Sequence, residues 1–416
     1  MMVRPRAVLM GLLLAAAGVL SPVVQSAHAQ PAPPSALPTD WAETLRAARG
    51  QTVYFHAWAG STHINAYIAW ASRIVEQRYG VRIEHVKLSD TSEAVSRILA
   101  ERTAGRTTGG AVDLVWINGE NFRAMKENNL LHGPWASTLP NWSLLNADEH
   151  PELTTDFTIA TDGLEVPWSR AQVVFYYDTA RLEEPPRNMK AFEAWLRDNP
   201  GRFTYPLPPE FLGTTFLKQA LYGLTPDPEE LLSPATDANY ARVTAPLWNF
   251  LDRITPLLWR RGRAYPPSGP RQLQLMADGE IDLAISFNPG EASAAISRYE
   301  LPPTVRTYVM EYGSLANASF LAIPFNASAM EGARVVANFL LSPEAQARKL
   351  DPDVWGAETV LDVDMLPERE REAFTRMEPG VATLAPDALG ERLPEPHPSW
   401  TERLEMEWSA RFGVGR

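Results

Sequence analysis

Polar and aromatic side chains gather in three segments that directly follow strand-like runs of this sequence, at 58–62, 118–121 and 205–215. In an open α/β sheet, ligands bind beyond the carboxyl ends of the strands, where loops lead into helices. The free N–H groups at helix starts favour hydrogen-bond acceptors and anions. The candidate ligand-binding residues in these segments are Trp58, Gly60, Ser61, Thr62, Asn118, Glu120, Asn121, Tyr205, Thr214 and Thr215.

Several of these side chains also fit an ordinary structural role. Trp58 can stack on a ring or sugar face, or it can belong to the core. Ser61 and Thr62 can donate hydroxyl groups to a ligand, although capping of the following helix explains both residue types as well. Glu120 can complement a helix dipole, or it can bind a cation or sugar hydroxyls.

Two extended segments, 166–177 and 314–324, add further candidates. Alternation along a strand places residues 168, 170 and 172 on one face, so Trp168 and Gln172 are expected to point the same way. Asn317 lies on the second extended segment, and Asn288 follows the buried run 281–287. Together these side chains predict a polar cleft lined by aromatic residues, as is usual for small-molecule sites.

The sequence gives no pattern for a metal site. Paired tyrosines can bind ferric iron, but Tyr176 and Tyr177 are neighbours on a strand and should point to opposite faces. His56 and His63 do not have a zinc-binding spacing. There is no cysteine, which excludes disulfides and thiolate ligands. We expect no metal and no cofactor.

An enzyme is also not indicated. The chain lacks the G-x-S-x-G, H-E-x-x-H, P-loop and dinucleotide-binding motifs. Paired carboxylates for glycoside hydrolysis could exist among its 50 acidic residues, but nothing in the sequence marks such a pair. Acidic residues exceed the 38 basic ones and give a net charge of −12, which argues against nucleic-acid binding.

The first residues have the features of an export signal. Arg4 and Arg6 precede an apolar run at 7–20, and Ala27-His28-Ala29 forms a small-x-small cleavage pattern. The run is too short to span a bilayer stably. We predict a signal peptide at 1–29, cleaved after Ala29, then a Pro-rich leader at 30–39 and a soluble periplasmic chain without a lipid anchor.

The remaining chain alternates between strand and helix patterns. Extended runs at 52–58, 81–88 and 111–117 are each followed by a helical pattern, which predicts an α/β fold with a parallel sheet. A second series of α/β elements lies between the two extended segments. Near the end, Trp400, Leu404, Trp408 and Phe412 recur at steps of four and predict a buried helix face.

Longer stretches carry a family resemblance. Residues 337–346 (ANFLLSPEAQ), 109–122, 242–251 and 351–356 resemble extracellular solute-binding proteins of family 1, type II, of the YnjB type. The resemblance covers nearly all of the chain after the leader. It implies a two-lobed type II periplasmic-binding-protein (venus-flytrap) fold with ligand bound between α/β lobes.

This resemblance also implies boundaries and partners. Lobe 1 would comprise 40–165 and 325–416, lobe 2 would comprise 178–313, and the hinge crossovers would be 166–177 and 314–324. The expected function is capture of a small polar molecule, such as a thiamine-like compound, a polyamine or a sugar. A monomer would then deliver it to an ABC permease and its ATPase. A ligand-sensing partner of a membrane receptor, or an exported hydrolase or lyase, are the alternatives.

Overall fold

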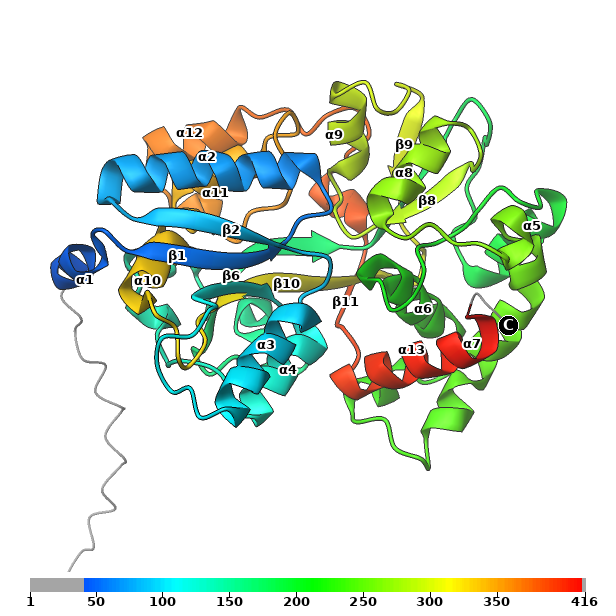
Figure 1. Ribbon diagram of the computed structural model, residues 1–416. Helices are drawn as coiled ribbons and strands as arrows, with labels where there is room; N and C mark the ends of the chain where they lie inside the picture. Colours follow the sequence, from blue (N-terminus) through cyan, green and yellow to red (C-terminus); the bar gives the residue numbers. More distant parts are fainter. Residues whose placement is uncertain (1–40, 414–416) are drawn as a thin grey trace, which may run out of the picture. The chain divides into compact units, whose positions relative to one another are not determined.

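The computed structural model describes residues 41–413 (Figure 1). The predicted signal peptide and the leader up to residue 40 lie outside the described residues. The rest contains two separate main sheets, one with six strands and one with three. Each sheet has its own buried apolar cluster, so the described residues form two α/β lobes.

The sheet of lobe 1 combines segments from distant parts of the sequence. β1 is parallel to β2 and β3, while β10 is antiparallel to β3 and to β6. β11 pairs with the start of β10. The strands are β1 (Thr52–Trp58), β2 (Arg82–Leu88), β3 (Leu114–Ile117), β6 (Glu165–Gln172), β10 (Ser314–Ala322) and β11 (Arg392–Leu393).

Helices cover both faces of this sheet. In Figure 1, α2, α11 and α12 lie above it, and α3 and α4 lie below it. The helices are α1 (Trp41–Ala48), α2 (Thr62–Tyr79), α3 (Ser92–Thr103), α4 (Gly119–Glu127), α10 (Met330–Leu340), α11 (Pro343–Leu350) and α12 (Glu368–Thr375). A small hairpin of β4 (Thr155–Asp156) and β5 (Ile159–Ala160) follows α4.

Local sequence explains where α2 begins and ends. The Ser61 hydroxyl accepts a hydrogen bond from the Ile64 N–H at 3.5 Å, and Gly80 ends the helix with a φ of +68°. Ile64, Ile68 and Val75 are buried, as their helical spacing predicts. This helix therefore holds its first residues at the carboxyl end of β1.

Lobe 2 is built around a three-stranded antiparallel sheet. β7 lies between β8 and β9 and pairs with both. Its elements are β7 (Val174–Asp178), β8 (Leu283–Ser286), β9 (Val305–Tyr308), α5 (Met189–Asp198), α6 (Phe211–Leu224), α7 (Tyr240–Ile254), α8 (Gly269–Ala277), α9 (Glu291–Ser297) and α13 (Pro398–Phe412). Val173 alone separates β6 in one sheet from β7 in the other.

One predicted boundary is wrong. The family resemblance implies that all of 325–416 belongs to lobe 1, but Trp400, Leu404 and Trp408 belong to the apolar cluster of lobe 2. The Trp408 Nε1–H donates to the Tyr205 hydroxyl at 3.0 Å. The chain therefore crosses to lobe 2 again after α12, and the C-terminal helix completes that core.

Candidate ligand-binding site

Lobe 1 places two carboxyl groups at the carboxyl end of β3. Gly119 begins α4 with a φ of +60°, and its N–H lies 2.9 and 2.8 Å from the two oxygens of Asp156. A Cβ at this glycine would lie 2.8 Å from the Phe157 ring, so any other residue would force the ring to shift. Glu120 follows in the first turn of the helix.

Lobe 2 places further carboxyl groups around α6. Glu210 caps this helix and accepts the N–H groups of Leu212 and Gly213 at 2.8 and 3.1 Å. One turn later, the Thr214 hydroxyl donates to the Glu405 carboxylate of α13 at 2.8 Å. Thus α6 and α13 together bring two carboxyl groups to the side of lobe 2 that meets lobe 1.

Lys218 connects these groups across the two lobes. Its Nζ donates to Glu395 at 2.7 Å, and both side chains are almost completely buried. The other Glu395 oxygen accepts the Asn317 Nδ2 at 2.9 Å. Lys218 Nζ also lies 4.6 Å from the centre of the Phe157 ring of lobe 1. The site is therefore an interface between the lobes.

We call Glu120, Asp156, Glu395 and Glu405 the acidic cluster. Among residues 41–413, Glu395 is the member that forms an ion pair, and Lys218 is its partner. Burial raises the pKa of Glu120, although attraction to Lys218 opposes the shift. Burial also raises the pKa of Asp156 well above its usual value. Burial therefore disfavours the ionised forms of Glu120 and Asp156, and neither carboxyl group has a cationic partner of its own among the ion pairs of the described residues.

Burial also raises the pKa values of the carboxyl groups around α6 in lobe 2. Burial raises the pKa of Glu405 to about 7, while the Thr214 hydrogen bond opposes the shift and repulsion from Glu120 adds to it. Burial raises the pKa of Glu210 to about 6, against the N–H donors at the start of α6. An added positive charge between the lobes would therefore stabilise the ionised forms.

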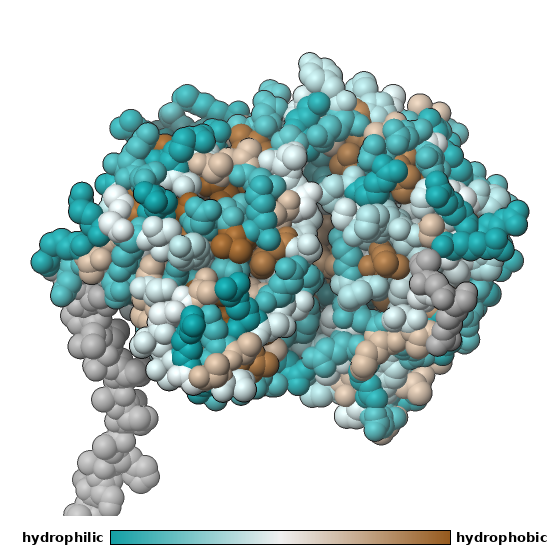
Figure 2. All heavy atoms as spheres, in the orientation of Figure 1, coloured by the Kyte–Doolittle hydropathy of each residue, from teal (hydrophilic) through white to brown (hydrophobic). Residues whose placement is uncertain are grey.

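Two further ion pairs connect the lobes. His63 Nε2, at the start of α2, lies 3.1 Å from Glu300 Oε1, which follows α9. Arg123 of α4 lies 3.4 Å from Glu402 of α13. A narrow groove runs between the two lobes on the face shown in Figure 2.

Comparison with known proteins decides the family. Residues 69–356 match the model of the bacterial extracellular solute-binding protein family. The chain belongs to this family. YnjB of Escherichia coli (strain K12) is 45% identical over 377 residues, which cover 90% of this chain and 95% of YnjB. The chain is the solute-binding component of an ABC transporter.

Solved structures show the same fold at low sequence identity. The periplasmic binding protein AfuA from Actinobacillus pleuropneumoniae, with fructose-6-phosphate bound, has a TM-score of 0.61 at 15% identity and covers 88% of this chain and 99% of its own. A spermidine/putrescine ABC transporter protein from Listeria monocytogenes has a TM-score of 0.58 at 18% identity, over 86% and 98%. Both confirm a type II periplasmic-binding-protein fold.

Several predicted residues of this solute-binding protein lie at the interface. Glu120, Thr214 and Asn317 contact or face the acidic cluster, and Asn121 Nδ2 lies 3.3 Å from the Glu120 carboxylate. Asn118 is the first residue after β3, at the N-terminus of α4. Residues from α4, α6 and β10 thus meet between the lobes, and ligand contact by each side chain stays a prediction.

The segment at 58–62 has mainly structural contacts. Ser61 caps α2, as the capping interpretation predicted. The Trp58 ring packs beside Gly60, where a Cβ would lie 2.1 Å from it, and Thr62 is exposed at the helix start. Asn288 accepts the Gly290 N–H at 3.0 Å in the turn before α9.

Four of the predicted contact residues are fully buried, where core packing and hydrogen bonds to the backbone account for them. Trp168 is fully buried, with its ring centre 4.9 Å from Trp116 and 5.4 Å from Trp355. Tyr205 is fully buried beside Trp408 in lobe 2. Gln172 and Thr215 are also fully buried and donate to the backbone carbonyls of Leu389 and Phe211.

The predicted alternation along β6 fails at one residue. Ser169 is opposite Ser319, whereas Pro167 is opposite Phe320, so Trp168 has no partner in β10. Such a bulge interrupts the period of two. The Trp168 carbonyl accepts the Gln346 Nε2 at 3.1 Å and also the Lys349 Nζ, both from α11. Simple alternation therefore does not fix the faces of residues 168 and 172 relative to each other.

Sequence reasoning missed Lys218, Asp156, Glu395 and Glu405. Lys218 is the only charged residue within the helical segment 211–224, and a lone charge among apolar residues is a signal of a buried ion pair. The two glutamates were missed because the C-terminal segment was assigned to the wrong lobe. Glu405 directly follows Leu404, which is buried in the core of lobe 2.

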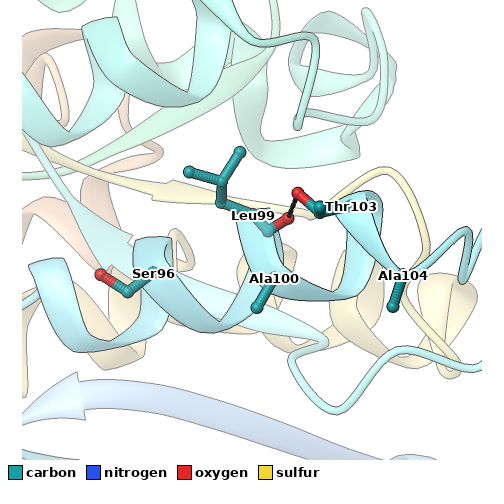
Figure 3. A pocket seen from close by; sticks show the side chains of 5 residues that line it. All are labelled: Ser96, Leu99, Ala100, Thr103 and Ala104. Atoms are coloured by element: carbon teal, nitrogen blue, oxygen red, sulfur yellow. Dashed lines mark hydrogen bonds between the residues drawn. The ribbon is translucent and has the colours of Figure 1, made fainter.

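Other features of the described residues do not suggest a second site. The side chain of Tyr176 lies in a small apolar cluster with α8 and α9, while Tyr177 packs against the main lobe 2 core, so they face opposite ways as predicted. A hollow of about 490 Å³ on α3 is lined by Ser96, Leu99, Ala100, Thr103 and Ala104 (Figure 3). It offers no charged group.

The same part of the chain shows no metal-binding group of three or more His, Cys, Asp or Glu residues. None of its helices is both long and apolar enough to cross a membrane.

Proposed function

We propose that this solute-binding protein captures a small organic cation in the periplasm and delivers it to the permease and ATPase of an ABC importer. The observation that carries the proposal is the acidic cluster, in which four carboxyl groups surround Lys218 at the lobe interface. Ammonium and similar cations would complete the neutralisation that Lys218 begins. Polyamines and thiamine-like compounds have this chemistry, and neutral sugars do not.

Capture requires that the ligand interact differently with the open and closed forms. Glu120 belongs to lobe 1 and Glu405 to lobe 2, and the two repel each other. A cation between them turns this repulsion into attraction to both lobes. We therefore propose that the ligand favours closure, with 166–177 and 314–324 as hinge crossovers.

No covalent chemistry is part of this proposal, and we propose no turnover of the ligand. We also keep the proposal that the signal peptide is cleaved after Ala29 and that the protein is released as a monomer. Two of the structurally similar proteins are named as spermidine/putrescine transporter components. At such low sequence identity, their structural similarity supports the fold alone. The ligand class proposed here therefore depends on the carboxyl groups of this chain.

The test is a binding panel with matched variants. Native mass spectrometry identifies any co-purified ligand. Thermal shift and calorimetry then compare spermidine, putrescine and thiamine with glucose and fructose 6-phosphate. We expect the cations to stabilise the protein, and Glu120→Gln or Glu405→Gln to weaken their binding about 10- to 100-fold, because each removes a charged hydrogen-bond acceptor.

Glu407→Gln is the matched control, because Glu407 lies on the same helix as Glu405 but pairs with Arg411 on the surface. The Glu407→Gln protein should bind the cation with the same affinity as the wild type. Stabilisation by a neutral sugar or an anion, without stabilisation by any cation, would overturn the proposed ligand class. So would a Glu120→Gln protein that binds the cation normally.

A further inference from the structure

The two ion pairs between the lobes define two rims of the interface. The α2–α9 rim contains His63 and Glu300, and the α4–α13 rim contains Arg123 and Glu402. In Figure 1, α2 and α9 lie above the level of β10, and α4 and α13 lie below it. Each rim combines residues of both lobes, so each exists as a continuous surface only when the lobes are together.

The α2–α9 rim displays an unusual aromatic residue. Tyr299 is 96% exposed, far more than the other large apolar side chains of the described residues. It follows α9 with a φ of +60°, while the Glu300 N–H bonds back to the Ala295 carbonyl at 2.8 Å. Glycine is the usual residue in this left-handed position, because a side chain there is strained.

Neighbouring contacts hold Tyr299 in this exposed position. Arg298 on one side pairs with Glu300 on the other at 2.9 Å. Glu300 in turn contacts His63 of lobe 1. The orientation of the Tyr299 loop is therefore connected to closure of the lobes. An exposed and strained aromatic side chain does not benefit folding, which points to a role in recognition.

Neighbouring segments extend this exposed surface. Pro302 and Pro303 are exposed next in the chain. Val381 is 55% exposed in a segment that is fastened to α9, because the Ala382 N–H donates to the Ser293 hydroxyl at 3.0 Å. Tyrosine at a fixed position offers a large contact area with little loss of side-chain freedom, which is typical of interface hot spots.

We propose that the α2–α9 rim, with Tyr299 as its anchor, is the surface of the closed protein that the membrane permease of the importer recognises. A permease must distinguish the closed protein from the open one, and this rim is complete only when His63 and Glu300 meet. The α4–α13 rim carries an exposed apolar residue too, Met406, but that residue lies in a regular helix without strain. Met406 therefore provides a matched control.

The direct test is site-specific cross-linking in cells that contain the importer. Tyr299 or Met406 is replaced by the photo-reactive residue benzoylphenylalanine, and cross-linked products are identified by mass spectrometry. We expect position 299 to give peptides of the permease and position 406 to give none. Permease peptides from position 406 alone, or from neither position in cells that import normally, would overturn the proposal. The result does not depend on whether the ligand is a cation.

A second variant separates recognition from folding. Tyr299→Gly removes the aromatic ring and relieves the strained conformation, so the melting temperature should stay equal or rise. In proteoliposomes with the permease and ATPase, the variant purified with its natural ligand should need at least 10-fold more protein for half-maximal stimulation of ATP hydrolysis. A lower melting temperature with normal stimulation would show a structural role instead and would contradict the proposal.

Discussion

At the scale of single residues, the ionisation of Glu405 connects the site to pH. Its pKa is raised from 4.5 to about 7, so the folded protein keeps this carboxyl group protonated where the unfolded chain would ionise it. The resulting contribution to stability is fully present below pH 4.5 and is lost as the pH rises through 7. Without ligand, the protein should therefore lose stability across this range.

Glu405→Gln should remove most of that loss, because glutamine can still accept the Thr214 hydrogen bond but cannot ionise. We expect the ligand-free variant to be about 1 to 3 kcal/mol more stable than the wild type at pH 8, after a reduction for partial exposure, and similar at pH 4. Urea unfolding at both values measures this. Equal or lower stability of the variant at pH 8 would contradict the shifted pKa.

Removal of the Lys218 charge should lower stability instead, because Lys218 is the positively charged partner of Glu395 in the acidic cluster. Lys218→Met leaves Glu395 buried without its ion-pair partner, which should lower the free energy of unfolding by about 3 to 5 kcal/mol. The double variant with Glu395→Gln should recover most of the loss, because no buried charge is left unpaired. Urea unfolding of both proteins at pH 7.5 checks this, and a single variant as stable as the wild type would refute it.

Single residues also show what sequence reasoning can achieve. The Ser61 cap and the position of Glu120 after β3 follow from local patterns, and both are confirmed. Trp168 was expected to line the cleft, but aromatic neighbours from α2 and 351–356 enclose it. The choice between a core tryptophan and an exposed one depends on such distant neighbours, which no local pattern contains.

At the scale of elements, the turn that begins α4 determines how Glu120 is presented. Gly119→Ala places a side chain at a φ of +60° and against the Phe157 ring. Gly105→Ala is a matched control, because its φ is +74° but a Cβ there meets no atom within 4 Å. We expect a loss of about 1 to 2 kcal/mol for the control.

Gly119→Ala should cost at least about 1 kcal/mol more, because the ring must move to accept the Cβ. It should also weaken binding of the cation, whereas Gly105→Ala should not. Urea unfolding and calorimetry provide both readouts. Equal losses for the two variants would show that Phe157 places no constraint on the start of α4.

The C-terminal helix shows why a helix is easier to predict from sequence than the elements against which it packs. The four-residue spacing correctly predicts that α13 has a buried face, and Trp400, Leu404 and Trp408 are buried. The same spacing cannot say which lobe covers that face. Only the three-dimensional path of residues 376–397 determines this, and the sequence between two helices does not encode it in any local pattern.

Trp408→Ala should therefore destabilise lobe 2. We expect a loss of about 3 to 5 kcal/mol, as is usual for removal of a buried aromatic side chain. Met406→Ala on the same helix should change stability by less than about 0.5 kcal/mol, because Met406 is exposed. Hydrogen exchange should show lost protection in β7–β9. A loss in β1–β3 instead would contradict this assignment of α13.

At the scale of the whole molecule, the sequence predicted the α/β class and the first three strands well. β1 matches its predicted range of 52–58, and β2 differs by one residue. The interpretation of 166–177 and 314–324 as crossovers between the lobes came from family resemblance, because pairing of strands almost 150 residues apart leaves no local signal. The acidic cluster likewise depends on contacts between distant segments, which explains why three of its four members, Asp156, Glu395 and Glu405, were missed.

Closure itself can be measured with paired cysteines, because the natural chain has none. We expect His63→Cys with Glu300→Cys to be joined by a short bis-maleimide faster when the most stabilising compound of the binding panel is present. Arg78→Cys with Glu344→Cys is the control, since both positions lie in lobe 1 and form an ion pair there. An equal response of the two pairs would argue against ligand-driven closure.

The return of the chain from α12 to lobe 2 has a practical consequence for protein production. A shortened chain ending near residue 390 would lack Trp400 and Trp408, which complete the core of lobe 2. It would also lack Glu395 and Glu405 of the acidic cluster. It should aggregate rather than persist as a weak binder, because an unsealed aromatic surface associates with other copies. Purification handles therefore belong between the proposed cleavage site after Ala29 and α1, whose Trp41 packs against the core of lobe 1.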